Sequence, residues 1–325
     1  MSVLLQVKGL TVHFHTKRGM VRAVDGISYD LAEGEILCMV GESGSGKSTS
    51  ILSLMKLLSK SKHDIIDGEV VFEGRELLRL SESEMRHVRG SRIAMVFQEP
   101  NTSLNPMLSV GRQISETLQH NLGMDRKAAI HRSAELLQMV GVADAKKRLG
   151  DYPHQFSGGM LQRVMIAMAL SCGPRLLLAD EPTSALDVTT QAQVLETIKS
   201  SADSGEMAVI LVTHNLGLAA QYCQRVIVMY AGHIVEEAPV LEFFNRPQHP
   251  YSQALIRAVP RLDQPVEERL CSIEGFPPNL VAPPGGCLFH PRCDYAIEVC
   301  STVVPSLTYV SESHRVACWV CSKGS

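Results

Sequence analysis

The sequence predicts an α/β fold with a mainly parallel sheet, and two observations carry this prediction. Residues 35–40, which are apolar after Glu35, lead into the glycine-rich segment 41–48, and a helical pattern begins near Lys47. Short strand-like runs return at residues 176–179 and 208–213, apolar except for Thr213, with a helical pattern between them. Buried strands that alternate with helices are typical of a parallel sheet covered by helices.

The remaining segments predict additions to this sheet. Residues 4–7 and 12–14 have strand character, and we expect antiparallel strands at the N-terminal end. Residues 99–172 are predicted to be a helical insertion. Within the insertion, helical patterns cover residues 113–122, 126–140 and 158–170. A further strand is expected at residues 225–230, after the insertion. Many prolines follow residue 239, so we expect one domain over 1–240 and a small irregular extension over 241–325.

Composition excludes several classes of protein. The 325 residues include 31 Lys and Arg against 34 Asp and Glu, and a net charge of -3 offers no broad basic surface for nucleic acid. No apolar run approaches the ~18 residues that would span a bilayer. The first residues lack a basic region followed by an apolar signal core, so we expect residence in the cytosol.

The glycine-rich segment predicts a phosphate-binding loop. Glycines let consecutive backbone N–H groups close around phosphate oxygens, and the helix that follows presents its positive end to the same charge. Lys47 would reach the terminal phosphates of a nucleotide, and Ser48 would hold magnesium. The residues of the expected loop are Gly41, Glu42, Ser43, Gly44, Ser45, Gly46, Lys47 and Ser48.

Polar residues at the ends of later strands complete this chemistry. Asp180 and Glu181 follow a buried strand, where one carboxylate can help hold magnesium while the other orients or deprotonates a water. His214 follows the next strand and can donate to a phosphate oxygen. Gln98 ends an earlier strand and can link the nucleotide to the helical insertion.

A second anion-binding helix start is predicted at Ser157, Gly158 and Gly159, which open a long apolar helix. One nucleotide needs only one glycine loop. A second site of this kind therefore implies phosphate supplied by another subunit, with a plain helix cap as the simpler alternative.

With these motifs in this order, residues 1–240 resemble the ATP-binding subunits of ABC transporters. In that resemblance residues 41–49, which end at Thr49, are the Walker A loop, and Asp180 and Glu181 are the Walker B pair. Ser48, Gln98 and Asp180 are the implied magnesium ligands. The other implied positions are Phe14 against adenine, Gln98 in the Q-loop, Ser157 to Met160 in the signature, Asp187 in the D-loop and His214 as the switch histidine.

Two further segments resemble one importer branch, that for oligopeptides, dipeptides and nickel. They are residues 152–160, around the signature, and residues 246–255, at the start of the extension. The resemblance implies a subunit that hydrolyses ATP to energise import of di- or oligopeptides, with nickel or another small solute as the alternative. A soluble ABC ATPase that acts on nucleic acid or ribosomes is the rival from another class.

The same resemblance implies partners and a location. ATP would lie between two ATPase subunits, of which the second is expected to be a paralogue. Two membrane permeases and an extracytoplasmic solute-binding protein would complete the importer. The chain would then bind peripherally at the cytoplasmic face of the inner membrane, without a transmembrane segment of its own.

Cysteines gather near the C-terminus, where Cys287, Cys293, Cys300 and Cys318 can supply four thiolates. Four thiolates are sufficient ligands for a tetrahedral zinc ion or a cubane iron-sulfur cluster. The spacing also resembles that of dipeptide-importer ATPase subunits with a 4Fe-4S cluster, which we expect here. Zinc and unliganded thiols are the alternatives, and Cys321 forms a second metal-like pair with Cys318.

Overall fold

A computed structural model describes residues 2–58, 64–259 and 273–321. The chain divides into two compact units, each of which is assembled from separate segments. Unit one consists of Met1–Leu4, Leu31–Ile36 and Arg79–Val212, and unit two consists of Leu5–Asp30, Leu37–Leu78 and Thr213–Ser325. Within the described ranges, no helix combines the length and the apolar character that crossing a bilayer requires.

Parallel strands form the core of unit one. β7 (Leu176–Asp180) lies between β6 (Ile93–Val96) and β8 (Ala208–Val212), and all of their residues are buried. Strands buried on both faces read as continuous apolar runs rather than alternating ones, which is why these segments could be predicted. Because the strands are parallel and in register, Val96 and Asp180 end at the same edge.

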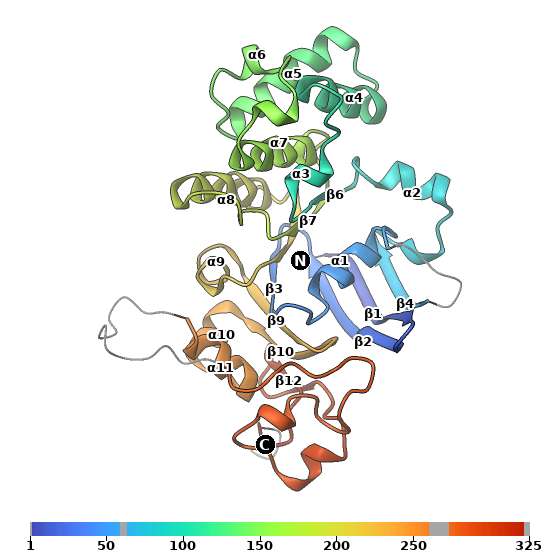
Figure 1. Cartoon of the computed structure of the whole chain (residues 1–325), viewed down its shortest axis with the longest axis vertical. Helices are drawn as coiled ribbons and strands as arrows, with labels where there is room; N and C mark the ends of the chain where they lie inside the picture. The colour runs from blue at the N-terminus through green and yellow to red at the C-terminus, as the bar shows by residue number, and fades with distance from the viewer. Residues whose placement is uncertain (1, 59–63, 260–272, 322–325) are drawn as a thin grey trace. The chain divides into compact units, whose positions relative to one another are not determined.

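Helices make up most of the remainder of unit one. α4, α5 and α7 group together in the green part of the ribbon (Figure 1). Ser109 caps α4 and Asp125 caps α5, each by accepting backbone N–H bonds. With Ser109 as its cap, α4 begins at Val110, three residues before the predicted start at residue 113. The helices are α2 (Glu82–Val88), α3 (Pro100–Ser103), α4 (Val110–Leu122), α5 (Arg126–Met139), α6 (Ala145–Arg148), α7 (Gly158–Leu170) and α8 (Val188–Asp203), with a 3-10 turn at Pro153–Gln155.

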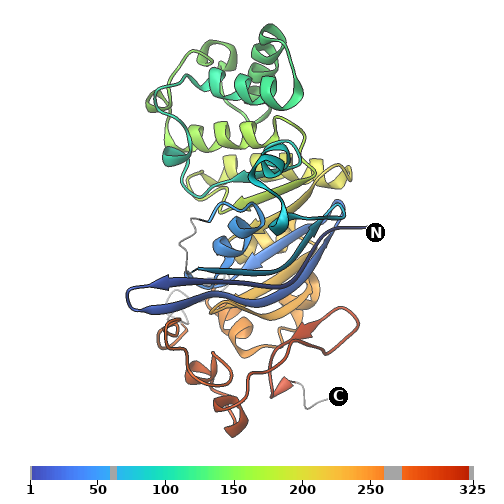
Figure 2. The same ribbon diagram turned by 90° about the vertical axis from the view of Figure 1, so that its right-hand side faces the viewer.

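An antiparallel sheet in the order β2-β1-β4-β5 confirms the antiparallel strands expected at the N-terminal end, and the predicted segments 4–7 and 12–14 both lie on the single strand β1. β1 (Val3–Thr16) and β2 (Gly19–Ala32) form a long hairpin, drawn in blue in Figure 2. β4 (Ile65–Phe72) and β5 (Arg75–Glu76) continue the sheet, and a 3-10 turn follows at Leu77–Arg79. The pairing of β1 with β4 shifts between Lys8 and Thr11, where the sheet has a bulge.

The second sheet of unit two leads to the glycine-rich segment. β3 (Ile36–Val40) runs parallel to β9 (Arg225–Tyr230), and β10 (His233–Pro239) returns antiparallel to β9. The edge continues through β12 (Arg315–Val316) to β11 (Thr308–Tyr309). The helices of this unit are α1 (Lys47–Leu54), α9 (Leu216–Tyr222), α10 (Val240–Asn245) and α11 (Pro250–Arg257), with 3-10 turns at His290–Arg292 and Glu298–Ser301.

Two buried carboxylates attach the C-terminal segment, which is the described part of the extension over residues 241–325, to β10. Glu236 is fully buried and accepts backbone N–H bonds from Gln248 (2.7 Å) and His249 (2.8 Å) and a bond from His314 (2.7 Å). Its neighbour Glu237 forms ion pairs with Arg225 and Arg315. Buried charges are tolerated when they are fully paired, so these contacts fix where the segment lies.

His249 caps α11 in a way that makes the attachment sensitive to pH. Its Nδ1 accepts the backbone N–H of Tyr251 (3.0 Å), which requires an unprotonated ring nitrogen. Burial lowers the pKa of His249 to about 4 from 6.5, against a smaller opposing effect of the Glu236 charge. The unfolded chain therefore binds this proton first as the pH falls, and stability decreases from pH 6.5 toward pH 4.

We expect the substitution His249→Asn to remove part of the acid sensitivity of this chain. An asparagine oxygen can cap α11 without titrating, so the variant should lose roughly 2 kcal/mol less stability than the unaltered chain between pH 7.5 and pH 5. Thermal unfolding of both proteins across this range measures the difference. Parallel pH profiles for the two proteins would contradict the assignment.

Candidate functional site

The glycine-rich segment forms a loop folded around Lys47. Lys47 is only 7% exposed, and its Nζ donates to the carbonyl oxygens of Gly41 (2.7 Å) and Glu42 (2.9 Å). Gly41 has a φ of 149°, and a Cβ there would overlap the Met229 carbonyl oxygen of β9. Only glycine fits this approach to the neighbouring strand. The loop therefore lies against the end of β9.

The loop ends at the N-terminus of α1. Gly46, in a left-handed conformation with φ 102°, precedes the helix and supplies no side-chain cap. Acidic residues are absent from the first turn of α1. The positive end of the helix dipole and the first backbone N–H groups therefore face the loop, which is the arrangement that binds phosphate.

Glu42 contacts residues that the sequence analysis did not assign to this site. Its backbone N–H donates to the hydroxyl of Tyr251 (2.7 Å), and its carboxylate receives two bonds from Arg292 (2.7 and 3.0 Å). Burial raises the pKa of Tyr251, and the hydrogen bond to Glu42 raises the pKa of Arg292. Tyr251 and Arg292 are 209 and 250 residues away from Glu42 in the sequence, and no local sequence pattern indicates these contacts.

In unit one, the predicted carboxylates lie at the end of β7. Asp180 is the last residue of that strand and is 5% exposed. Glu181 has a φ of 47°, and its N–H donates to the carbonyl oxygen of Val212 at the end of β8 (2.9 Å). A left-handed conformation at a non-glycine residue is uncommon and is found at functional sites.

Gln98 lies beside Glu181, as expected from their positions after neighbouring strands. The side-chain amide of Gln98 donates to a carboxylate oxygen of Glu181 (3.2 Å). Gln98 is exposed and Glu181 half-buried. The same edge of the parallel sheet thus brings together an amide and two carboxylates, a set of oxygen ligands that suits Mg2+.

His214 belongs to unit two and follows β8. The preceding residue, Thr213, donates its N–H to the carbonyl oxygen of Met39 on β3 (3.2 Å). Asn215 caps α9 by accepting the N–H of Gly217 (3.0 Å), and its own N–H donates to Thr213 (3.0 Å). His214 is exposed. It lies in a turn that Thr213 and Asn215 hold on either side, next to β3, which leads to the glycine loop.

The predicted second helix start is present at α7. The Ser157 hydroxyl accepts the N–H of Met160 (3.3 Å), and both Ser157 and Gly158 are exposed. A Cβ on Gly159 would lie 3.3 Å from the carbonyl oxygen of Ala185, so the backbone at Gly159 lies close to the loop between β7 and α8. Ser157 thus caps α7 and lies at an accessible surface.

Asp187 and Phe14, which the resemblance assigned to the nucleotide site, lie at a helix cap and on a strand. Asp187 caps α8 by accepting the N–H of Thr190 (3.0 Å), and this hydrogen bond lowers the pKa of Asp187. Thr190 is held in turn by Arg163 (2.5 Å). Phe14 is half-buried on β1.

The four predicted cysteine ligands lie in one part of the C-terminal segment. Cys300 and Cys318 are buried, and Cys287 and Cys293 are half-buried. Burial raises the pKa of Cys287 to about 11, with further upward contributions from the thiolates of Cys300, Cys318 and Cys293. The N–H of Cys287 donates to the carbonyl oxygen of Cys300 (2.8 Å).

These sulfurs are near enough to interact electrostatically. However, the described residues contain no group of three or more His, Cys, Asp or Glu side chains arranged to hold a metal ion. Cys321, which the sequence left unassigned, lies beside Cys318 and lowers the pKa of that thiol through hydrogen bonding. The structure therefore shows the thiols gathered together but does not show a metal site.

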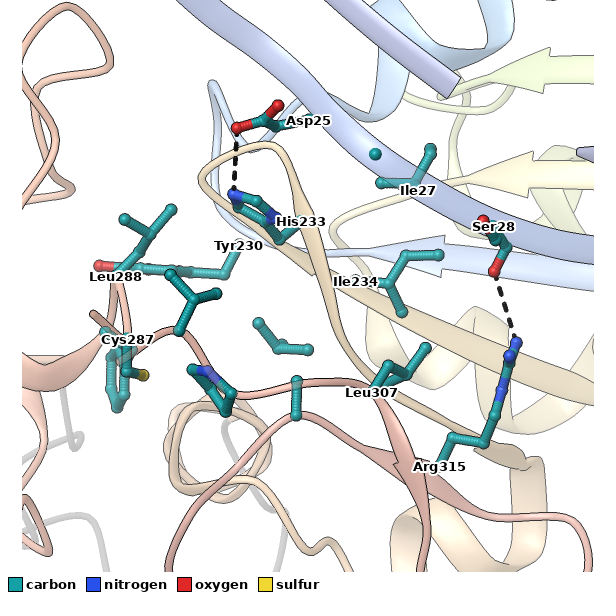
Figure 3. Close-up of a pocket in the computed structure, with 16 residues that line it drawn as sticks. Asp25, Ile27, Ser28, Tyr230, His233, Ile234, Cys287, Leu288, Leu307 and Arg315 are labelled. Carbon is teal, nitrogen blue, oxygen red and sulfur yellow. Dashed lines mark hydrogen bonds and ion pairs between the residues drawn. The ribbon is translucent and has the colours of Figure 1, made fainter. Parts of the chain in front are cut away.

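A cavity of about 370 Å³ lies elsewhere in unit two (Figure 3). Apolar side chains such as Ile27, Ile234 and Leu307 line it, and a contact between His233 and Asp25 (3.7 Å) lies at one side. Burial lowers the pKa of His233. The residues of the glycine loop do not line this cavity, and we assign it no ligand.

Comparison with known proteins identifies two family regions. Residues 24–184 match the model of the ABC transporter family, and residues 235–300 match that of the oligopeptide/dipeptide transporter C-terminal region. The first region contains the glycine loop, Gln98, the start of α7 and the carboxylates. The second contains α11 and three of the four cysteines.

Curated relatives match nearly the whole chain. A probable peptide ABC transporter ATP-binding protein of Sinorhizobium fredii is 50% identical, covering 98% of this chain and 95% of the relative. The dipeptide transport ATP-binding protein DppD of Bacillus subtilis is 48% identical with the same coverage. The oligopeptide transport ATP-binding protein OppD of Bacillus subtilis is 47% identical and covers 98% and 88% of the two chains.

The fold agrees with solved structures. A dimeric ATP-binding cassette in a post-hydrolysis state, bound to ADP and Pi, matches with a TM-score of 0.67 and 28% identity. The match covers 73% of this chain and 98% of that cassette. This confirms the predicted P-loop α/β fold. With the glycine loop folded around Lys47 and with relatives of this similarity over nearly the full length, the chain belongs to the ATP-hydrolysing, ATP-binding subunits of ABC transporters, in the oligopeptide/dipeptide family.

Proposed function

We propose that this chain hydrolyses ATP to energise the import of di- or oligopeptides through an ABC transporter. The match of residues 235–300 to the C-terminal region of oligopeptide/dipeptide transporters carries the proposal, because this region lies outside the ATPase motifs. The curated relatives described above are named for peptide transport, which favours peptides over nickel or another small solute. The net charge of -3 disfavours the rival role on nucleic acid or ribosomes.

We propose roles for the motif residues that the local geometry of each unit supports. The loop from Gly41 to Thr49, with the N-terminus of α1, would hold the phosphates of ATP, and Phe14 would stack on adenine. Ser48, Gln98 and Asp180 would hold Mg2+, which neutralises phosphate charge. The hydrogen bond between Gln98 and Glu181 supports their shared place in the site.

Hydrolysis requires a water positioned for attack on the terminal phosphate. Glu181 is the proposed base, because its carboxylate lies at the strand end beside Asp180 and is oriented by Gln98. His214 would donate to a phosphate oxygen as negative charge develops there. The unusual backbone conformation of Glu181 supports a role that fixes this side chain in one direction.

A second ATPase subunit, a paralogue in our proposal, would complete each nucleotide site. Ser157, Gly158 and Gly159 would contact ATP held by the partner's glycine loop, and Asp187 would lie at the same interface. The exposure of Ser157 and Gly158 supports this arrangement. Two membrane permeases and an extracytoplasmic solute-binding protein are the other proposed partners, and the chain would act at the cytoplasmic face of the inner membrane.

The proposed division of labour places the ATPase in residues 1–240, with the helical insertion over 99–172. Residues 241–325 form the extension, in which we propose a metal group held by Cys287, Cys293, Cys300 and Cys318. The mutual electrostatic influence of these thiols and their burial supports this donor set. A 4Fe-4S cluster is the proposed occupant and zinc the alternative. Either would brace a segment with few regular elements.

Glu181→Gln tests the proposed function in the assembled importer. Without the base, we expect ATP to bind normally while turnover falls by roughly 100-fold or more, and dipeptide uptake should stop with it. ATP hydrolysis and uptake of a labelled dipeptide into proteoliposomes measure both effects. Lys47→Ala is the comparison variant, because it should weaken ATP binding itself. Near-normal turnover in the Glu181 variant would refute the assigned base.

A mixed complex tests the role of Ser157 across the interface. If the partner ATPase has complete motifs, Ser157→Ala should impair hydrolysis at the site that contains the partner's lysine and spare the site that contains Lys47. Inactivating one lysine at a time and measuring the residual turnover separates the two sites. Loss confined to the Lys47 site would rule out this arrangement.

The cysteine group is tested by composition. Anaerobically purified protein should be brown and contain about four irons per chain, the number of a four-cysteine cubane cluster. Cys293→Ser or Cys300→Ser should remove the colour, while ATP binding persists. Stoichiometric zinc without iron or sulfide would replace the cluster with a zinc site, and protein without any bound metal would overturn both.

A further inference from the structure

The loop residue Glu42 is held by two residues of the C-terminal extension. Tyr251 accepts its backbone N–H, and Arg292 pairs with its carboxylate. We propose that Arg292 and Tyr251 are positioning residues of the phosphate loop, through which the extension sets the affinity of this chain for ATP. The proposal rests on the proposed function, in that the loop is taken to bind ATP.

The charge of Glu42 opposes the binding of phosphate by the loop. Glu42 places a carboxylate in a loop whose expected ligand is a polyanion, and like charges at close range oppose binding. The Glu42 side chain is only 26% exposed, so water screens it incompletely. The two bonds from Arg292 neutralise this charge in the bidentate geometry that is the strongest for a carboxylate. Arg292 thereby removes a repulsion that the loop itself creates.

Several contacts hold the Arg292 side chain in place. Its side chain is 4% exposed and also donates to the carbonyl oxygens of Ile273 (3.2 Å) and Glu274 (2.8 Å). The guanidinium lies 5.9 Å from the ring centres of both Tyr230 and Phe289. A guanidinium held from several sides loses little further freedom when it pairs with Glu42, so the contact is preorganised.

Tyr251 provides a second, uncharged anchor for the same residue. It is fully buried, and its ring lies 4.6 Å from that of Tyr230 and 5.3 Å from that of Phe289. Tyr230 ends β9, whereas Tyr251 and Phe289 belong to the C-terminal segment. This packed group of rings therefore connects the extension to the start of the loop, where the Tyr251 hydroxyl fixes the Glu42 backbone.

The experiment measures ATP affinity in the full-length chain, by titration with a fluorescent ATP analogue in the presence of Mg2+. Arg292→Met keeps the apolar stem but leaves the Glu42 carboxylate unpaired, and we expect Kd to rise roughly tenfold. Glu42→Gln combined with Arg292→Met removes both charges, and the double variant should return to within about twofold of the unaltered chain. Tyr251→Phe removes only the hydroxyl and should weaken binding to a smaller extent.

Arg315→Met is the matched control. Arg315 is a half-buried arginine of the extension that pairs with Glu237 on β10 rather than with the loop, and Glu237 keeps its ion pair with Arg225 of β9 when Arg315 is replaced. Its loss should leave the Kd for ATP unchanged. Restoration in the double variant also distinguishes charge from misfolding, because Glu42→Gln cannot repair an extension that Arg292→Met has unfolded.

Unchanged affinity in Arg292→Met, or a double variant as weak as the single one, would overturn the proposal. An equal loss in Arg315→Met would also overturn it, because the effect would then reflect the stability of the extension. If the unaltered chain binds no nucleotide, both this proposal and the proposed function fail. If the unaltered chain binds ATP and the variants bind it with the same Kd, only the positioning role fails.

Discussion

The two adjacent carboxylates of β10 determine much of what unit two can do. Glu236 and Glu237 are buried, and a buried carboxylate is costly unless every bond it needs is supplied. Arg225 of β9 pairs with Glu237, and the other partners come from the C-terminal segment: the backbone N–H groups of Gln248 and His249 and the side chains of His314 and Arg315. The segment therefore cannot leave β10 without exposing unpaired charge in the protein interior. Its position is fixed by electrostatics and by the short pairing of β10 with β12, rather than by a large apolar core.

This attachment explains how an irregular segment reaches a loop at the other end of the chain. Once His249 is held by Glu236, α11 begins at Pro250, and Tyr251 in its first turn lies against the ring of Tyr230. The 3-10 turn that ends at Arg292 packs through Phe289 against the same ring. Tyr230 is the last residue of β9, the strand whose end also bounds Gly41. A single strand end thus organises both the phosphate loop and its contacts with the extension.

Features that depend on local pattern could be predicted from the sequence. The buried strands β7 and β8 read as apolar runs, α1 begins at the predicted Lys47, and α7 covers the predicted residues 158–170. Proximity of Gln98 to Glu181 also follows from topology, because neighbouring parallel strands end at one edge. Arg292 and Tyr251 could not be found in this way. Their contacts with Glu42 depend on long-range packing, and neither residue lies in a motif with a known phosphate role.

The ion pair of Glu42 and Arg292 also has a consequence for biosynthesis. Its partners are 250 residues apart, so at ribosomal rates of ~5–20 residues per second Arg292 is made roughly 12 to 50 s after Glu42. Until then the nascent chain carries a phosphate loop with an uncompensated carboxylate. The loop's charge balance therefore depends on a residue that is made long after the loop itself, and a chain terminated before residue 292 would lack the side chain that neutralises its own loop.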